Sequence, residues 1–353
     1  MKKQTIVVNS RFLTQKISGV QRFAIELSLR LKKLMPEVLF VTPHNIIHYN
    51  LADQLEAVVI GKNQGHIWEQ YDLPMFLKKH SNSMPLLVNL ANTAPIFYKK
   101  KVATVHDLAV YDVPKSYSFT FRLIYKIMLP AIIRTSQKVF TVSNFSQNRI
   151  KDRFGITPVI ISNSVSSFFS ADKSVKKEKI ILAVSSLDPK KNFSSLIEAF
   201  IRANLIEYKL VIVGARNNLF DQINLISDKN TDKDNIVFTG HISDSDLASI
   251  YQRASVFVYP SFYEGFGIPP LEAMASGCPT IVSDIPSLRE VCGDASIYVD
   301  PYDVSDIANK LREVCYNLEL QTYLHKKGLE NIRRFSWENS SVKLLHHISE
   351  TIQ

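Results

Sequence analysis

Short runs of β-branched and other apolar residues alternate along this chain with longer segments in which apolar residues recur at helical spacing. The first apolar run, residues 5–8, precedes residues 20–34, where Val20, Phe23 and Leu27 fall on one helical face. Further strands are predicted for the following runs: residues 101–105, 138–142, 159–161, 180–184, 210–214, 236–238, 256–259 and 280–282. Because strands and helices alternate, the pattern predicts an α/β protein with parallel sheets.

The chain of 353 residues is long enough for two domains. A charged segment, residues 170–179, interrupts the alternation, and a fresh apolar run starts at Ile180. We place the linker in this segment and predict two Rossmann-like, doubly wound domains, residues 1–170 and 171–335. In such sheets ligands bind at the carboxyl ends of the strands, so we expect the site in a central cleft between the domains.

Composition sets limits on where the protein works. Hydrophobic residues make up 46% and charged residues 21% of the chain, which is typical of a globular protein. The apolar run at residues 6–8 is too short for a signal-peptide core, and no later stretch approaches the roughly 18 apolar residues of a membrane span. The three cysteines, Cys278, Cys292 and Cys315, have no CxxC spacing, which favours reduced thiols in a cytoplasmic protein.

Positive charge is concentrated in the first half of the chain. Residues 1–165 contain 22 Lys and Arg against 9 Asp and Glu, whereas residues 166–353 contain 20 against 24. A basic half suggests an anionic partner such as a membrane surface, a lipid phosphate or a nucleic acid; a merely soluble cationic surface is the alternative. No recognisable nucleic-acid module accompanies the lysine runs, so we expect no nucleic-acid partner.

Residues 116–126 combine aromatic and basic side chains, a composition suited to a membrane interface. The residues concerned are Tyr117, Phe119, Phe121, Tyr125, Arg122 and Lys126. Packing of these aromatic side chains in the domain core is the alternative. Together with the charge asymmetry, the segment predicts a protein that lies peripherally on the anionic inner face of the plasma membrane.

The most informative segment, residues 258–277, combines the end of a strand, a glycine-bearing loop and a short helix. Pro269 and Pro270 suit the first helical turn, and Gly277 suits the end of the helix. Backbone N–H groups at such a helix start favour an anion, such as a diphosphate, or a sugar hydroxyl. These groups belong to Gly265, Phe266, Gly267 and Ile268.

Two glutamates, Glu264 and Glu272, accompany this helix start, and each carboxylate can accept two hydroxyl hydrogen bonds from a sugar or a ribose. Two solvated helix-end charges are the alternative. The segment resembles the Glu-x7-Glu motif of the retaining GT-B glycosyltransferases of family 4, the group 1 glycosyltransferases, and the resemblance continues through residues 278–301. It implies that Glu272 binds the ribose of a nucleotide-diphosphate sugar, and that Glu264 and the neighbouring amides hold the donor sugar at the catalytic centre.

Residues 184–192 resemble the strand-end loop of the same family, whose basic pair binds the donor diphosphate. Lys190 and Lys191 occupy those positions, and two cations there would neutralise the charge that builds on a leaving nucleoside diphosphate. A solvated lysine pair is the alternative. Many members have an arginine several positions earlier, where this chain has Ser185 and Ser186; we count Ser186 among the nucleotide-sugar-binding residues and Lys191 among the catalytic ones.

The first half of the chain also resembles the family. Residues 9–13 with 18–22 resemble its first strand-to-helix loop, where Gly19 would let the backbone approach the donor phosphate or the acceptor, or would simply form a turn. His106 follows a predicted strand, where an imidazole can hydrogen-bond a hydroxyl or polarise the reacting centre; a structural histidine is the alternative. Residues 65–70 resemble a bacterial polysaccharide subgroup and are interpreted as packing and acceptor-side residues. Residues 336–353 resemble the helix that crosses back to the first domain.

Asp244 and Asp246 form the Asp-x-Asp pattern that metal-dependent glycosyltransferases use to hold a divalent cation. An apparent helix follows directly, however, so Ser243 or Asp244 is better interpreted as its N-cap. We therefore predict no metal site and no cofactor.

The resemblance implies a retaining, metal-independent transferase that moves a hexose to a growing lipid-linked surface glycan such as O-antigen, capsule or exopolysaccharide. GDP-mannose is the first candidate donor, with dTDP-rhamnose or a UDP-hexose next, and a polyprenyl-diphosphate-linked glycan is the expected acceptor. Two alternatives share the fold: a nucleotide-sugar 2-epimerase and a catalytically silent scaffold.

Overall fold

The computed structural model describes residues 5–172, apart from 80–83, and residues 174–185, 188–214 and 235–352. The chain divides into two compact units: unit 1 comprises Met1–Asn163 with Ser336–Gln353, and unit 2 comprises Ser164–Phe335. The boundary between the units, at residues 163–164, precedes the predicted linker at residues 170–179, and the charged residues of that segment lie in unit 2. Gln252 Nε2 donates a 2.7 Å hydrogen bond to the Ser170 carbonyl, and strand β8 already begins at Glu178, which ties this segment to unit 2.

In its described part, unit 1 has a seven-stranded parallel sheet in the order β3-β2-β1-β4-β5-β6-β7. The strands are β1 (Ile6–Asn9), β2 (Leu39–Thr42), β3 (Val58–Val59), β4 (Leu86–Asn89), β5 (Lys101–Thr104), β6 (Lys138–Thr141) and β7 (Val159–Ile160). The strand order reverses between β1 and β4, which pair in parallel with Val7 opposite Leu87. Connections from these two strands leave on opposite faces of the sheet, and such a reversal is where doubly wound sheets bind ligands.

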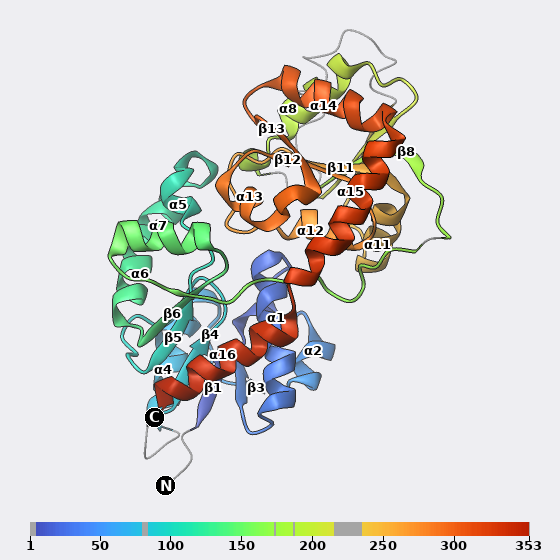
Figure 1. The fold of residues 1–353 in the computed structure, drawn as a ribbon. Helices are drawn as coiled ribbons and strands as arrows, with labels where there is room; N and C mark the ends of the chain where they lie inside the picture. The colour runs from blue at the N-terminus through green and yellow to red at the C-terminus, as the bar shows by residue number, and fades with distance from the viewer. Residues whose placement is uncertain (1–4, 80–83, 173, 186–187, 215–234, 353) are drawn as a thin grey trace. The chain divides into compact units, whose positions relative to one another are not determined.

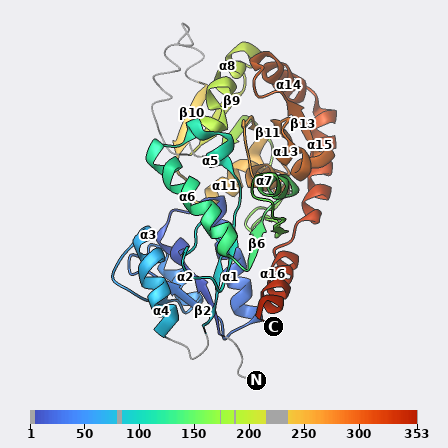
Figure 2. The same ribbon diagram turned by 90° about the vertical axis from the view of Figure 1, so that its left-hand side faces the viewer.

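The helices of unit 1 cover both faces of this sheet (Figures 1 and 2). They are α1 (Gly19–Leu34), α2 (Tyr49–Gln54), α3 (Gly65–Ile67), α4 (Leu73–Lys79), α5 (Ala109–Asp112), α6 (Phe119–Thr135), α7 (Asn144–Phe154) and α16 (Trp337–Ile352). Helix α16 packs against α1: the rings of Trp337 and Phe23 lie 6.0 Å apart, and Arg30 pairs with Glu338 at 2.8 Å. The last helix of the chain therefore belongs to unit 1.

Unit 2 repeats the arrangement with a six-stranded parallel sheet among its described residues, in the order β10-β9-β8-β11-β12-β13. The strands are β8 (Glu178–Val184), β9 (Lys209–Val213), β10 (Ile236–Gly240), β11 (Ala254–Tyr259), β12 (Thr280–Ser283) and β13 (Ser296–Val299). The order reverses between β8 and β11. The predicted fold class, two doubly wound α/β domains, is confirmed, while β2, β3, β4 and β13 are strands that the sequence pattern did not identify.

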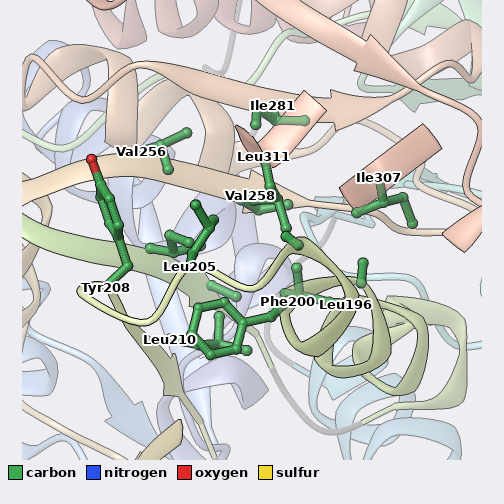
Figure 3. Close-up of a cluster of buried hydrophobic side chains, with 14 of the residues drawn as sticks. Leu196, Phe200, Leu205, Tyr208, Leu210, Val256, Val258, Ile281, Ile307 and Leu311 are labelled. Atoms are coloured by element: carbon green, nitrogen blue, oxygen red, sulfur yellow. The ribbon is translucent and has the colours of Figure 1, made fainter. Parts of the chain in front are cut away.

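The core of unit 2 lies between its sheet and helices α8 (Phe193–Ala203) and α14 (Val304–Tyr316). Figure 3 shows Leu196 and Phe200 of α8 packed with Leu311 of α14 against Val256 and Val258 of β11. The other α-helices among the described residues of the unit are α11 (Asp244–Arg253), α12 (Ile268–Ala275), α13 (Pro286–Cys292) and α15 (Leu318–Asn331). Strand β11 is buried along its whole length, which explains why it reads as a continuous apolar run.

Candidate functional site

The predicted lysine pair lies in a short 3-10 turn, Pro189–Lys191, after strand β8. Asp188 caps this turn, because its Oδ1 accepts a 3.0 Å hydrogen bond from the Lys190 N–H. Asn192 ends the turn in the left-handed conformation, with φ of 59°, and its buried amide donates to the carbonyls of Pro260 (3.1 Å) and Pro301 (2.7 Å). These bonds fix the turn to the loop that follows β11 and to the segment that follows β13. Ser186, a predicted ligand of the nucleotide sugar, lies outside the described residues.

The structure brings Lys191 and Glu264 together across the strand reversal of unit 2. Lys191 Nζ donates to Glu264 Oε1 and to the Tyr259 hydroxyl oxygen, both at 2.7 Å, and the two charged side chains are only 11% and 10% exposed. Burial raises the pKa of the Glu264 carboxyl, but the positive charges of Lys191 and Lys190 outweigh it, so the pKa lies below its usual value. Glu264 is therefore an ionised hydrogen-bond acceptor at neutral pH.

The start of helix α12 lies in the same loop, which continues from Glu264 through the buried residues Gly265 and Phe266. Gly267 precedes the helix with φ of 92°, a conformation that favours glycine. Pro269 and Pro270 have no N–H, so the two amides that the helix leaves without an intrahelical partner are those of Gly267 and Ile268. Gly277, with φ of 70°, follows the end of the helix, and the predicted proline start and glycine end are both confirmed.

Glu272 lies on α12 itself and is half-buried. Its Oε2 accepts a 3.2 Å hydrogen bond from the Tyr251 hydroxyl. Burial, with the negative charge of Glu272, raises the pKa of Tyr251 well above its usual value, so this phenol stays neutral and donates. The bond fixes the direction of the Glu272 carboxylate on the same helix whose start carries the Gly267 and Ile268 amides.

His106 and Gly19 belong to unit 1. His106 is buried after strand β5, and its Nε2 lies 3.0 Å from the Leu90 carbonyl oxygen. Because a carbonyl only accepts, Nε2 carries the proton and Nδ1 is the acceptor. Burial lowers the pKa of His106, so the ring is neutral at pH 7 and can accept a hydrogen bond from a hydroxyl. Gly19 is the exposed first residue of α1, with Ser18 as N-cap.

The Asp-x-Asp pattern forms a helix start, as predicted. Ser243 Oγ accepts a 3.1 Å hydrogen bond from the Asp246 N–H at the beginning of α11. Within the described ranges, the one group of His, Cys, Asp and Glu side chains close enough to share an ion is His346, His347 and Glu350 on the surface of α16. The Glu350 carboxylate already has a positively charged partner, because Lys138 Nζ forms an ion pair with it at 2.8 Å.

Three polar contributors to this site were not identified from the sequence: Tyr259, Tyr251 and Asn192. Each lies beside a predicted site residue in space, although only Asn192 is next to one in the chain. Tyr259 ends an apolar strand and Tyr251 lies on a helix with a buried face, so both were indistinguishable from core residues. The signal for Asn192 was its position directly after the lysine pair.

Residues 166–331 match the family model described as "Glycosyl transferases group 1". The chain is 31% identical over 256 residues to the O-antigen chain mannosyltransferase RfbU of Salmonella typhimurium, and this alignment covers 70% of each protein. It is 29% identical over 274 residues to the O-antigen chain mannosyltransferase B of Escherichia coli, covering 71% of this chain and 72% of that protein. Among solved structures, it resembles Anabaena Alr3699/HepE in complex with UDP and glucose, with a TM-score of 0.77, 17% identity, and 99% and 100% of the two chains covered. The sucrose-phosphate synthase of Thermosynechococcus elongatus has a TM-score of 0.76 at 19% identity, with 99% of each chain covered.

Proposed function

Because this chain belongs to the group 1 glycosyl transferases and has their GT-B fold, we propose that it is a retaining, family 4 hexosyltransferase that uses a nucleotide-diphosphate sugar. The observation that carries the proposal is the Lys191–Glu264 pair at the strand reversal of unit 2, in which Glu264 lies in the same loop as the amides of Gly267 and Ile268 at the start of α12. The two relatives named as O-antigen chain mannosyltransferases favour mannose as the transferred sugar, so GDP-mannose is the first candidate donor. dTDP-rhamnose and a UDP-hexose are the next candidates.

Different residues of this site would bind the diphosphate, the hexose and the ribose of the donor, according to the charge of each part. Lys190 and Lys191 bind the diphosphate, and the amides of Gly267 and Ile268 add N–H donors beside it. When the Lys191 ammonium turns to the phosphate, Glu264 Oε1 loses its present donor and accepts hydroxyls of the hexose instead. Glu272, held by Tyr251, accepts hydrogen bonds from the ribose diol.

The reaction proposed for this site needs no protein nucleophile. The bond from the anomeric carbon to the phosphate oxygen breaks, and the acceptor oxygen bonds to that carbon on the same face. The acceptor proton passes to the leaving phosphate. The protein then contributes positioning and charge stabilisation, with Lys190 and Lys191 neutralising the leaving diphosphate and His106 accepting from a hydroxyl of the transferred sugar.

Removal of Glu272 tests the donor site. Because each hydrogen bond to a charged group contributes about 1.5–3 kcal/mol, we expect Glu272→Ala to weaken nucleotide binding by at least about tenfold. Calorimetry with GDP, UDP and dTDP measures the affinity and also identifies the base. Glu313→Ala is the matched control, because Glu313 pairs with Lys310 on the exposed face of α14. Unchanged nucleotide affinity in Glu272→Ala would show that the ribose assignment is wrong.

Metal independence is part of the proposal, because Lys190 and Lys191 supply the positive charge that a divalent ion supplies elsewhere. We expect the rate of sugar transfer to be unchanged in excess EDTA. Loss of activity that magnesium or manganese restores would contradict this expectation and would make Asp244 and Asp246 candidate ligands.

We also propose that helix α6, drawn in green in Figures 1 and 2, docks on an anionic membrane that carries a polyprenyl-diphosphate-linked acceptor. No helix within the described ranges is long and apolar enough to cross a bilayer. Along α6, however, Phe119, Leu123 and Ile127 are spaced four residues apart and are 73%, 51% and 63% exposed. The exposed Lys115 and Lys126 lie nearby in the chain and suit anionic lipid headgroups.

Sedimentation with vesicles tests this docking. We expect more protein to sediment with phosphatidylglycerol vesicles than with phosphatidylcholine vesicles, and less as salt rises. Burying an isoleucine side chain contributes about 1.5–3 kcal/mol, so Ile127→Gln should lower the partition coefficient by about tenfold or more. Ile206→Gln, at a position 73% exposed in unit 2, is the control. Equal sedimentation with both vesicles at low salt would contradict the docking.

A further inference from the structure

Unit 1 contains a second buried polar group at its own strand reversal, which the proposed function leaves unused. We call it the Arg11–Glu69 cluster; it comprises Asn9, Arg11, Glu69, Asn89 and Thr93, all buried. Asn9 ends β1 and Asn89 ends β4, the two strands between which the order reverses. The cluster therefore occupies the position where a doubly wound sheet binds ligands.

One oxygen of Glu69 organises the cluster. Its Oε1 accepts hydrogen bonds from Asn9 Nδ2 (2.9 Å) and Thr93 Oγ1 (3.0 Å), and Arg11 Nε lies 3.3 Å away. Arg11 Nη2 donates to Thr93 at 2.7 Å, and Asn9 also donates to Asn89 at 3.0 Å. One carboxylate oxygen thus holds together the end of β1, at residues 9–11, and the segment after β4 that contains Thr93.

The backbone holds Glu69 in place through a π-helical turn, Trp68–Asp72. Trp68 is buried and donates from Nε1 to the Ile60 carbonyl at 2.7 Å, while Gln70 bonds the Ala94 carbonyl and the Ile96 N–H, both at 2.9 Å. Single π-helical turns interrupt helices at a cost and are found often at functional sites. Here the turn directs a carboxylate inward between two anchored neighbours.

The other oxygen, Glu69 Oε2, is buried and makes no hydrogen bond with any described residue. Its nearest ionisable neighbour is His66, whose Nδ1 is 3.5 Å away and whose side chain is 43% exposed. Burial raises the pKa of Glu69, but His66, Arg11 and the hydrogen-bond donors lower it further, so the carboxylate is ionised. The contact with His66 is long for a hydrogen bond, so this buried, ionised oxygen is incompletely satisfied, and a hydroxyl at ordinary hydrogen-bond distance would stabilise it.

Charge and shape indicate the class of ligand. Arg11 disfavours a cation and Glu69 disfavours an anion, which leaves a neutral hydroxyl as the donor. Beside the cluster, the rings of Tyr117, Phe121 and Tyr125 stack at 5.1 and 4.0 Å, and His66 lies edge-on to Tyr125 at 6.2 Å. His66, which contacts this ring, also lies 3.5 Å from Glu69, so it links Tyr125 to the cluster. Apolar rings next to converging polar groups suit a pyranose, which has C–H faces and hydroxyl edges.

We propose that the Arg11–Glu69 cluster binds a neutral pyranose residue of the acceptor glycan, one ring hydroxyl donating to Glu69 Oε2 in place of His66. That the pyranose belongs to the acceptor rests on the proposed function; that the cluster binds a pyranose does not. In this proposal the hydroxyl displaces His66, whose side chain is 43% exposed, and not one of the buried partners of Oε1.

Saturation-transfer NMR with methyl α-D-mannopyranoside and methyl α-L-rhamnopyranoside, in saturating GDP, tests the proposal. We expect binding to the wild-type protein and a dissociation constant raised at least about tenfold in Glu69→Gln. The glutamine Oε1 stays with the Asn9 and Thr93 donors, so its NH2 group, which cannot accept, replaces Oε2. Glu56→Gln makes the same change at an exposed carboxylate paired with Lys32, and should bind as the wild type does.

A second pair of variants leaves the buried hydrogen bonds intact. His66→Trp should cover Oε2 and abolish pyranoside binding, whereas Ile67→Trp, at the adjacent position 66% exposed, should not. Nucleotide binding, measured in parallel, should be unchanged in all four variants. Pyranoside binding that survives both Glu69→Gln and His66→Trp, or a wild-type protein that binds nucleotide but neither pyranoside, would overturn the proposal. A wild-type protein that binds the pyranosides in buffer without GDP and binds no nucleotide would instead overturn the proposed function and uphold the cluster.

Discussion

Replacing Lys191 with alanine should lower the rate of sugar transfer about 100- to 1,000-fold, the usual loss when one group that stabilises transition-state charge is removed. Lys191 is the cation that contacts both Glu264 and Tyr259, so its loss removes the charge that the leaving diphosphate requires. Release of nucleoside diphosphate from a saturating donor measures the effect. Because Lys191→Ala also leaves Glu264 buried without its ion-pair partner, we expect a stability loss of about 3–5 kcal/mol, and the assay belongs well below the melting temperature.

Lys179→Ala is the matched control for this experiment. Lys179 belongs to the same unit and also pairs with a glutamate, Glu207, but both side chains are largely exposed. Surface pairs of this kind contribute little, so rate and stability should stay at wild-type values. Wild-type turnover in a folded Lys191→Ala protein would remove Lys191 from the mechanism.

The second large effect is expected at Gly267, where alanine should destabilise the protein by about 2–5 kcal/mol. A residue with a Cβ pays about 1–2 kcal/mol in the left-handed region, and the φ of Gly267 is 92°. The added Cβ would also lie 2.5 Å from Cδ2 of Leu288, which is fully buried, and such overpacking costs about 1–3 kcal/mol. Urea unfolding followed by circular dichroism measures the change.

Gly155→Ala separates the two causes. Gly155 ends α7 with φ of 71°, and a Cβ there would meet nothing within 4 Å, so only the conformational cost of about 1–2 kcal/mol applies. Equal destabilisation of the two variants would show that the contact with Leu288 is relieved at no cost. A Gly267→Ala protein as stable as the wild type would contradict both the conformational cost and the cost of the contact with Leu288.

Helix α12 and strands β8 and β11 could be predicted from the sequence because each has a local signal. Two prolines open α12, a glycine follows its end, and β8 and β11 are continuous apolar runs since both faces of their sheet are covered. Strand β13 escaped detection because Ile297 and Tyr298 are only half-buried, and β3 because its two residues are exposed. Partial burial does not explain β2 and β4, which are almost entirely buried and which the sequence pattern also did not identify.

The site was predictable as a set of residues but not as a set of contacts. Lys191 and Glu264 each had a motif, yet their 2.7 Å contact depends on β8 and β11 being neighbours, and strand order is not written in any local pattern. Glu69 was noted within a segment interpreted as packing and acceptor-side residues. Its burial at the β1–β4 reversal depends on a π-helical turn, for which the sequence offered no signal.

The return of α16 to unit 1 has a consequence for how the chain folds during synthesis. Trp337 packs on Phe23, and Phe23 in turn packs on the ring of His106, with centroids 6.0 and 4.8 Å apart. The ribosome makes all of unit 2 before it makes Trp337, so the support behind His106 is added after the second unit has already emerged. Domains fold as units while the chain grows. The unit that begins synthesis first is therefore completed last, and the nascent chain has to keep the face of α1 that receives α16 uncovered until then.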